Sequence, residues 1–588
     1  MESYERTSVA SRSRIKPGFT LGGEQAEADP LAIDAFVNSN LYEVVEDRAD
    51  RRCFLVGRTG SGKSAALQHL EETEPDHVIR ISPEDLSLPY ITDMQLIRFM
   101  DSLDVKLDLF WIALWKHLLL VEIIRHRYGV NSLESKQRFL GALRDKLQRQ
   151  PGKQAALEYL DEFQGRFWVD ADERVREITD RFTEKVGAEF KGSGSVGAAS
   201  ASGAISASQE QSSEQRTELA SRYQRIVNET QLAKINQMLT VLNDEILDEV
   251  NFTYIIIDDL DRDWVDERLS NSLIRCLFRT VLDLQRVKNL KIVVALRTNI
   301  FQELDFGSSG GQEEKFRALV LEMRWTKPVL ENILDERVRV SQAKSSLDAT
   351  TFRELLPHAN NTRGNPLEYI MDRTLLRPRD AIAFANQCLL SGAGKTKLTW
   401  DDIKTAEVTY SANRLLALRD EWKPTYPGID DLLTKFRGAP ARMSKKEFQE
   451  RLEECALLMS SVNFRGTAWL TPLAEPIWEA GHSNLSWFDR YSGLTGLFYN
   501  IGVIGCASAG TAAPTFFDAD PNLASSPSRL EKSEYFHVHR MLHRALDISV
   551  SQDHRARHSV VSERGAAEES EYFAGGRDEA QEDRPRWR

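Results

Sequence analysis

The 588-residue sequence predicts an α/β protein with a parallel sheet core. Three observations support this fold class. A glycine-rich pattern follows a short apolar run that ends at Val56, a second apolar run ends in acidic residues at Asp258, and a third ends in a polar residue at Arg297. Apolar runs that deliver polar groups at their carboxyl ends are typical of open parallel sheets, which bind ligands at that edge.

Length, charge and cysteine content limit the classes of protein to consider. A chain of this length is too long for one hydrophobic core, so we expect several domains. The net charge of −13 argues against a protein that coats nucleic acid, although a basic patch on one domain remains open. Five singly placed cysteines favour a reducing cytoplasm over disulfide bonds or a zinc site. The start of the chain has no apolar run, so we expect a flexible N-terminus over residues 1–24 and no secretory signal.

The glycine-rich pattern fits G-x-x-x-x-G-K-[ST] without a mismatch. Such a loop directs consecutive backbone N–H groups into one concavity, at the positive end of the following helix. We expect Lys63 to reach the β- and γ-phosphates of ATP or GTP and Ser64 to ligate Mg²⁺. The motif therefore predicts the phosphate-binding loop of a P-loop NTPase. The alternative is an ordinary glycine-rich turn that binds no phosphate. The predicted nucleotide-binding residues are Gly57, Arg58, Thr59, Gly60, Ser61, Gly62, Lys63 and Ser64.

The elements around this loop indicate how the sheet begins. Residues 29–37 have apolar residues at helical spacing behind an Asp cap, which predicts a helix. Residues 54–56 read as a buried strand, residues 64–70 as the helix after the loop, and residues 78–81 as a second strand. This order of strand, loop, helix and strand is typical of a parallel α/β sheet.

A long insertion separates the two halves of the predicted sheet. It is mainly helical over residues 87–250, with a loop rich in Gly, Ala and Ser at 187–213. Its most apolar segment, residues 109–124, could be interpreted from its hydrophobicity as a membrane span. That piece carries Lys116, His117 and Glu122 in its middle, which favours a buried helix instead.

The acidic residues follow a β-prone run at 252–257. We expect Asp258 to hold Mg²⁺ with its water shell, and Asp259 to polarise the attacking water where many ATPases carry Glu. A strand that ends in a solvated acidic turn is the alternative. A calcium loop counted from Asp259 fails, because position six is Trp264 instead of Gly and position twelve is Ser270 instead of Glu.

The next predicted strand, residues 291–296, ends in Arg297. This side chain, or Asn299, would lie in the ligand-binding crevice and sense the γ-phosphate or its water. A surface arginine in a turn between strand and helix is the alternative.

The P-loop, the Ile-Ile-Ile-Asp-Asp-Leu-Asp-Arg run and the strand ending in Arg297 together resemble additional-strand P-loop ATPases, closest to the bacterial STAND and KAP-like groups of the AAA+-related class. The resemblance implies ATP and Mg²⁺ as cofactors and a helical lid. In such a lid a second sensor arginine approaches the phosphates, and Arg379 is the candidate, with Arg377 second. A basic, solvent-facing helix start is the alternative. KAP proteins carry transmembrane helices between the two Walker motifs, and this chain has an insertion there without convincing spans.

The chain after residue 426 changes to short helices and strand-like segments. Residues 487–505 predict a helix turning into a strand, and residues 536–539 predict a second strand before a helix at 541–546. That order suggests a winged-helix-like module, for which the acidic balance favours protein packing over DNA binding. A metal cluster of His537, His539 and His543 is disfavoured, since no Cys or carboxylate set accompanies it.

The expected division of the chain follows from these elements. It comprises a flexible N-terminus (1–24), the two halves of the ATPase core (25–86 and 251–340), the insertion (87–250), a helical lid (341–425), the winged-helix-like domain (426–548) and a disordered tail (549–588).

The function expected is an ATP-hydrolysing, nucleotide-dependent switch or remodelling motor without a membrane anchor. We expect it to act as a homo-oligomer or with a protein partner. A DNA-binding ATPase resembling origin-recognition proteins, or a scaffold that uses nucleotide only to fold, are alternatives. A GTPase is disfavoured because no N-K-x-D motif occurs. The family resemblance implies a role in bacterial defence against phage.

Overall fold

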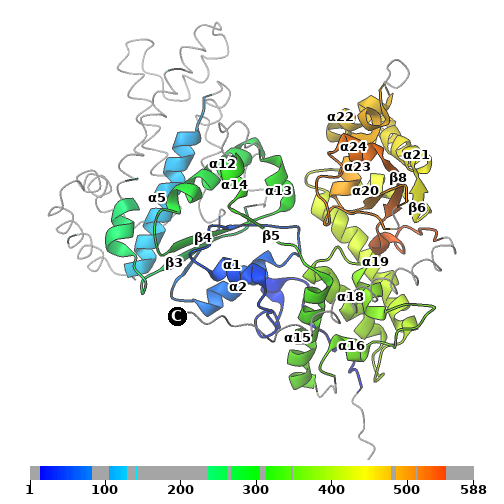
Figure 1. Ribbon diagram of the computed structural model, residues 1–588, viewed down its shortest axis with the longest axis horizontal. Coiled ribbons are helices and arrows are strands. Elements are labelled where there is room, and N and C mark those ends of the chain that lie inside the picture. Colours follow the sequence, from blue (N-terminus) through cyan, green and yellow to red (C-terminus); the bar gives the residue numbers. More distant parts are fainter. Residues whose placement is uncertain are drawn as a thin grey trace, which may run out of the picture. The chain divides into compact units, whose positions relative to one another are not determined.

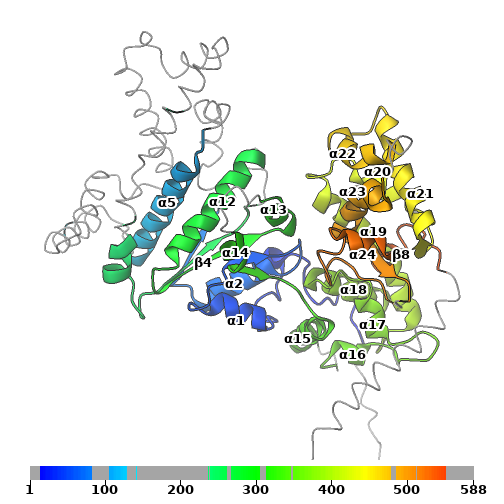
Figure 2. The ribbon, with the colours of Figure 1, turned by 45° about the horizontal axis from the view of Figure 1, so that its top comes forward.

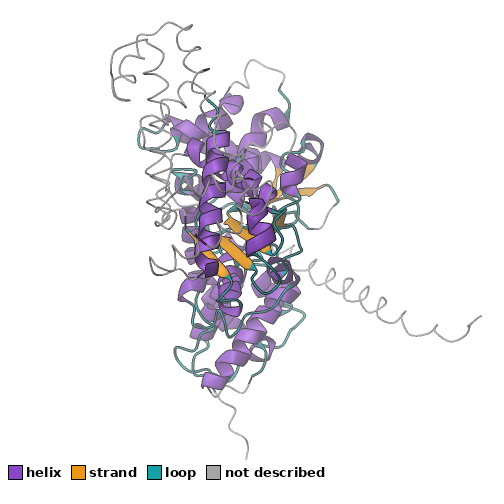
Figure 3. Ribbon diagram, turned by 90° about the vertical axis from the view of Figure 1, so that its left-hand side faces the viewer, coloured by secondary structure: helices purple, strands orange, loops and turns teal. Residues whose placement is uncertain are grey.

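The computed structural model describes residues 14–82, 105–128, 239–260, 267–304, 313–345, 349–478, 485–510 and 513–550, together with residues 141, 221 and 236. The chain divides into two compact units. The core unit is Asn38–Met323, and the C-terminal unit combines Met1–Val37 with Arg324–Arg588. Helices make up most of the described chain, and the strands form two separate sheets (Figure 3).

The core unit contains a five-stranded parallel sheet of order β2-β3-β4-β1-β5. An additional strand, β4, therefore lies between the strand before the glycine-rich loop and the strand before the acidic residues. β1, β3 and β4 consist entirely of buried residues, as expected for central strands of a parallel sheet. The strands are β1 (Phe54–Val56), β2 (Val78–Ile81), β3 (Thr253–Ile257), β4 (Leu290–Leu296) and β5 (Val320–Glu322).

Helices cover both faces of this sheet (Figures 1 and 2). α5 (Asp108–Tyr128) and α12 (Glu267–Leu284) lie side by side on one face, and α1 (Asn40–Glu46) and α2 (Lys63–Thr73) lie on the other. Alternate residues of a strand point to opposite faces of the sheet. Phe54 of β1 points to the face that carries α12, where its ring stacks on that of Phe278 with the ring centroids 3.5 Å apart. The remaining elements of this unit are η4 (Leu242–Ile246), α13 (Thr298–Glu303) and α14 (Glu313–Arg317).

The apolar piece at residues 109–124 forms α5 and is buried against the sheet and α12, as predicted. Its buried Lys116 pairs with Asp283 of α12 at 2.6 Å, and the indole N–H of Trp115 donates to the carbonyl of Leu273 at 3.1 Å. Among the described helices, none is long and apolar enough to cross a membrane.

The C-terminal unit begins with a helical region whose ends follow sequence signals. α18 has Pro378 at its first position, and α19 starts with a capping box in which Thr399 and Asp402 bond reciprocally to each other's backbone N–H groups. The helices are α15 (Lys327–Ser345), α16 (Phe352–Leu355), α17 (Pro366–Met371), α18 (Pro378–Ser391) and α19 (Trp400–Trp422).

The same unit ends in a three-stranded antiparallel sheet of order β6-β8-β7 with helices packed on it. The predicted helix and two strands are present as α23, β7 and β8, whereas residues 541–546 contain only a 3-10 turn. The elements are α20 (Ile429–Thr434), β6 (Arg442–Ser444), α21 (Lys445–Ala456), η6 (Leu457–Ser460), α22 (Thr467–Trp478), α23 (Trp487–Asn500), β7 (Ile504–Ser508), α24 (Pro527–Glu531), β8 (Ser533–Val538) and η8 (Arg540–Leu542).

The predicted helix at residues 29–37 is wrong. The structure has a short 3-10 helix, η1 (Ala26–Ala28), followed by turns. The Asp29 carboxylate does not cap a helix, because it is used in tertiary contacts: it accepts from the N–H of Gly23 at 2.8 Å and pairs with Arg337 of α15 at 2.7 Å.

The domain boundaries differ from those expected at two places. Part of the segment assigned to a flexible N-terminus packs in the C-terminal unit. Ile15 and Leu21 are buried there, and the N–H of Ile15 donates to the backbone carbonyl of Lys395. Residues 25–37 and 324–340, expected in the ATPase core, also belong to the C-terminal unit. The expected loop at 187–213 and residues 551–588 of the expected tail lie outside the described residues.

Candidate nucleotide-binding site

The glycine-rich loop joins β1 to α2 in the core unit. Gly60 and Gly62 have φ values of +80° and +91°, a left-handed conformation that favours glycine. Gly57 is constrained by space instead. A Cβ atom there would lie 2.4 Å from Ser61 Oγ and 2.9 Å from Met323 Cβ. The loop can therefore keep this conformation only with glycine at these positions.

Lys63 is the first residue of α2, and its ammonium group turns back into the loop. Nζ donates to the carbonyls of Gly57 at 2.7 Å and Arg58 at 3.2 Å. Ser64 follows in the first turn of the helix, and Arg58 and Thr59 complete the loop. The helix N-terminus, the ammonium and the left-handed glycines form a cradle that suits a phosphate chain.

The acidic pair follows β3 directly. Asp259 has a φ of +59°, and its N–H donates to Asp258 Oδ1 at 2.9 Å. Burial raises the pKa of Asp258 above its usual value, while that hydrogen bond and the nearby charges of Arg80 and Lys63 act to lower it. A carboxylate at Asp258 and a hydroxyl at Ser64 are oxygen donors of the kind that Mg²⁺ prefers, so the residues fit the expected ion.

Arg80 is a contact of this site that the sequence analysis missed. It lies on β2, next to β3, and donates from Nη2 to Asp258 Oδ2 at 3.1 Å and from Nη1 to Glu71 Oε2 of α2 at 3.0 Å. The available signal was that Arg80 is the single charged residue in the strand Val78–Ile81.

Arg297 follows β4 and is the N-cap of α13. The strand pairings locate it: Ile257 pairs with Val294 and Val56 pairs with Leu296, so the end of β4 lies between the acidic residues and the start of the loop. The N–H of Gly57 donates to the carbonyl of Leu296 at 3.2 Å. The structure thus brings the predicted loop, Asp258, Asp259 and Arg297 to one edge of one sheet.

Arg379 and Arg377 belong to the C-terminal unit. Arg379 Nε donates to the carbonyl of Glu24 at 3.0 Å. Arg377 is buried and pairs with Asp380 at 3.0 Å and Glu421 at 3.1 Å. Arg377, the second candidate for the sensor arginine, therefore has its guanidinium held inside its own unit, and the alternative of a solvent-facing basic helix start does not describe it.

Two of the three histidines considered for a metal cluster bond to nearby backbone groups. His539 Nδ1 accepts from the N–H of Met541, and His543 Nε2 bonds to the carbonyl of Val538 at 3.0 Å. Within the described parts of the chain, no group of His, Cys, Asp and Glu side chains is arranged to hold a metal ion.

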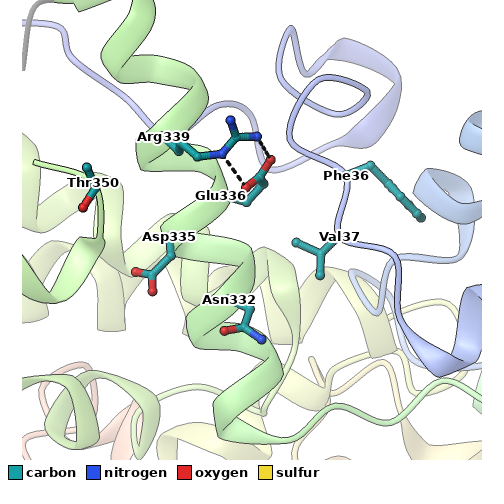
Figure 4. Close-up of a pocket in the computed structure, with 7 residues that line it drawn as sticks. All are labelled: Phe36, Val37, Asn332, Asp335, Glu336, Arg339 and Thr350. Carbon is teal, nitrogen blue, oxygen red and sulfur yellow. Dashed lines mark hydrogen bonds and ion pairs between the residues drawn. The ribbon is translucent and has the colours of Figure 1, made fainter.

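A separate pocket of about 380 Å³ lies in the C-terminal unit (Figure 4). Figure 4 shows Arg339 bonded to Glu336, both on α15, and Asp335 beside them. The two carboxylates and the absence of a glycine-rich loop among the lining residues make this pocket unsuitable for a phosphate chain. Its lining residues are Phe36, Val37, Asn332, Asp335, Glu336, Arg339 and Thr350.

Comparisons with known proteins match part of this architecture. Residues 328–419 match the family model described as the FunZ-associated C-terminal helical domain. No curated protein matches the chain.

Two solved structures show a distant likeness. The Orc1 protein of Aeropyrum pernix in complex with DNA is similar at 11% identity and a TM-score of 0.30, over 93% of this chain and 98% of that chain. Cdc6p from Pyrobaculum aerophilum is similar at 11% identity and a TM-score of 0.22, over 82% of this chain and 87% of that chain.

Proposed function

We propose that this chain binds ATP with Mg²⁺, hydrolyses it, and acts as a nucleotide-dependent switch or remodelling motor. The observation that carries the proposal is the meeting of Lys63, Asp258 and Arg297 at the carboxyl edge of one parallel sheet with β4 as an additional strand. Such an edge is where open α/β sheets bind ligands.

Each residue has a role in this proposal. The N–H groups of the loop and the ammonium of Lys63 bind the β- and γ-phosphates, and Ser64 and Asp258 hold Mg²⁺, which neutralises phosphate charge. Asp259 accepts a proton from the attacking water and orients it. Arg297 donates to the γ-phosphate as negative charge develops there.

The C-terminal unit completes the proposal as a helical lid. Arg379 supplies a second positive charge to the phosphates. Its guanidinium bonds to the backbone carbonyl of Glu24, whereas Arg377 is retained by two ion pairs. We therefore retain Arg379 as the sensor arginine and set Arg377 aside.

The proposed output is contact with a protein partner or another copy of the chain. In the winged-helix-like module, α23 would be the helix that reads DNA. It contains one basic residue, Arg490, has six buried residues among its 14, and has α22 packed against it. Sequence readout of DNA by α23 is therefore disfavoured.

The resemblance to bacterial STAND and KAP-like ATPases extends the proposal to a role in defence against phage.

Lys63→Ala tests the binding step. Loss of a charge-assisted contact should weaken affinity for a fluorescent ATP analogue by about 10- to 100-fold and abolish phosphate release. The matched control is Arg52→Gln in the same unit, because Arg52 forms an exposed pair with Asp50. Equal affinity and equal phosphate release in all three proteins would exclude the proposal.

A further inference from the structure

The ion pair between Arg80 and Asp258 concerns the carboxylate to which the proposed function assigns Mg²⁺. Asp258 is mostly enclosed, with 13% of its side chain exposed, whereas the side chains of Arg80 and Glu71 are each 37% exposed. Arg80 Nη2 binds Asp258 Oδ2, and the other oxygen, Oδ1, accepts the N–H of Asp259. Both oxygens of this carboxylate are therefore engaged by protein donors.

A guanidinium and a divalent cation compete for such a carboxylate. Both are positive, and both require an oxygen of the same enclosed group, so their mutual repulsion is weakly screened there. A cation that binds at Oδ2 therefore competes with Arg80 for this carboxylate and favours its withdrawal.

Glu71 provides the place to which Arg80 can withdraw. It lies on α2, the helix that begins at the phosphate-binding loop, and it already accepts Nη1 of Arg80 at 3.0 Å. The two guanidinium nitrogens thus bind two different carboxylates, and release from Asp258 leaves the bond to Glu71 intact.

We propose that Arg80 is a displaceable counter-ion of Asp258 that sets the Mg²⁺ requirement of the site, with Glu71 retaining Arg80 when Mg²⁺ binds. The inference rests on the proposed function. Arg80 is here a positioning residue, which acts on the ion through Asp258 and does not contact nucleotide.

The test is a double-mutant cycle on the full-length chain, read by Mn²⁺ binding instead of turnover. Bound Mn²⁺ is measured by electron paramagnetic resonance, with a saturating non-hydrolysable ATP analogue. Arg80→Gln should lower the Mn²⁺ concentration at half-saturation by roughly 2- to 5-fold, because the competing charge is gone. Glu71→Gln should raise it by a similar factor, because Arg80 is then left with Asp258 alone.

The double variant separates this mechanism from a general charge effect. If Glu71 acts through Arg80, then Glu71→Gln should have little effect when Arg80→Gln is already present. Arg52→Gln removes the same charge from an exposed pair elsewhere in the core unit and should leave the Mn²⁺ midpoint unchanged. Circular dichroism spectra check that each variant is folded. If Arg80→Gln is unstable, Glu71→Gln still tests the inference, because Glu71 lies at a half-exposed position on a helix.

The outcomes distinguish this inference from the proposed function. An unchanged or raised Mn²⁺ midpoint in Arg80→Gln, or equal effects of Glu71→Gln in both backgrounds, would overturn the counter-ion role while nucleotide binding by the wild type persists. A wild-type chain that binds neither the analogue nor Mn²⁺ would overturn both.

Discussion

Asp259 combines a chemical role with an unusual backbone conformation. Its φ of +59° lies in the left-handed region, which costs most non-glycine residues roughly 1 kcal/mol but is tolerated by Asp and Asn. This conformation turns the chain sharply after β3, so that the N–H of Asp259 reaches Asp258. The conformational preference also makes Asn the appropriate substitution for testing the proposed chemistry.

Asp259→Asn should keep the fold and nucleotide affinity of the wild type but lower phosphate release by about 100-fold or more, since the amide cannot accept the proton. Asp259→Glu restores a carboxylate in a residue less suited to this φ, and should lower the free energy of unfolding by about 1 kcal/mol. Chemical denaturation and a phosphate-release assay measure the two effects. Wild-type turnover in Asp259→Asn would remove Asp259 from the proposed mechanism.

The buried histidines of the C-terminal unit should make its stability depend on pH. Burial lowers the pKa of His539 to about 3 and that of His543 to about 4, below the ordinary value of about 6.5. Between pH 6.5 and 4 the unfolded chain therefore binds more protons than the folded one, and stability should fall as the pH falls, by up to about 1.4 kcal/mol per pH unit for each histidine.

Thermal unfolding of the full chain between pH 7 and pH 4.5 measures this dependence. His539→Asn keeps an acceptor for the N–H of Met541 without an ionisable ring, and should flatten the curve. A slope identical to that of the wild type would show that other groups control the acid sensitivity.

At the scale of elements, the buried side chain of Lys291 on β4 forms hydrogen bonds with the C-terminal end of α1. Lys291 Nζ donates to the carbonyls of Val44, Asp47 and Asp50 at 2.8, 2.7 and 2.8 Å. These carbonyls lie at and after the C-terminal end of α1, where a helix leaves its last acceptors without partners. A single side chain thus satisfies the end of α1 and attaches that helix to the sheet.

Lys291→Met should lower the free energy of unfolding by about 2–4 kcal/mol, since buried acceptors lose their donor. Lys288→Met is the matched control, because Lys288 is exposed and precedes the same strand. Urea denaturation measures both variants. A similar loss in both would show that the effect does not come from the contacts with α1.

At the scale of the whole molecule, the chain crosses between its two units twice. It leaves the C-terminal unit after Val37, forms the core unit, and returns at Arg324. The N-terminal segment remains attached to the C-terminal unit by the buried pair of Asp29 and Arg337.

If the proposed contact is with another copy of the chain, ATP should raise the particle mass of the wild type to a multiple of the chain mass. Size-exclusion chromatography with light scattering, with and without the non-hydrolysable analogue, measures this change. Lys63→Ala is the control and should not respond. A monomer with full ATPase activity would exclude another copy of the chain as the required partner.

The sequence alone determined the local parts of the site. Gly57, Gly62, Lys63 and the acidic pair were predictable because their chemistry is contained in short motifs, and β1 and β2 were predicted with their observed bounds because a buried strand is a continuous apolar run. β5 and β6 were missed, since three residues contain too little pattern to define a strand. The helix predicted at residues 29–37 failed because the Asp29 carboxylate accepts from the nearby N–H groups of Gly23 and Leu31 in a turn and pairs with the distant Arg337.

Only the tertiary structure decided which side chains meet. It inserted β4 between β1 and β3, which brings Arg297 between the loop and the acidic residues. It also paired Arg80 with Asp258, 178 residues away, and Lys291 with the end of α1. No local pattern contains these contacts, because strand order and register bring together residues that are far apart in the chain.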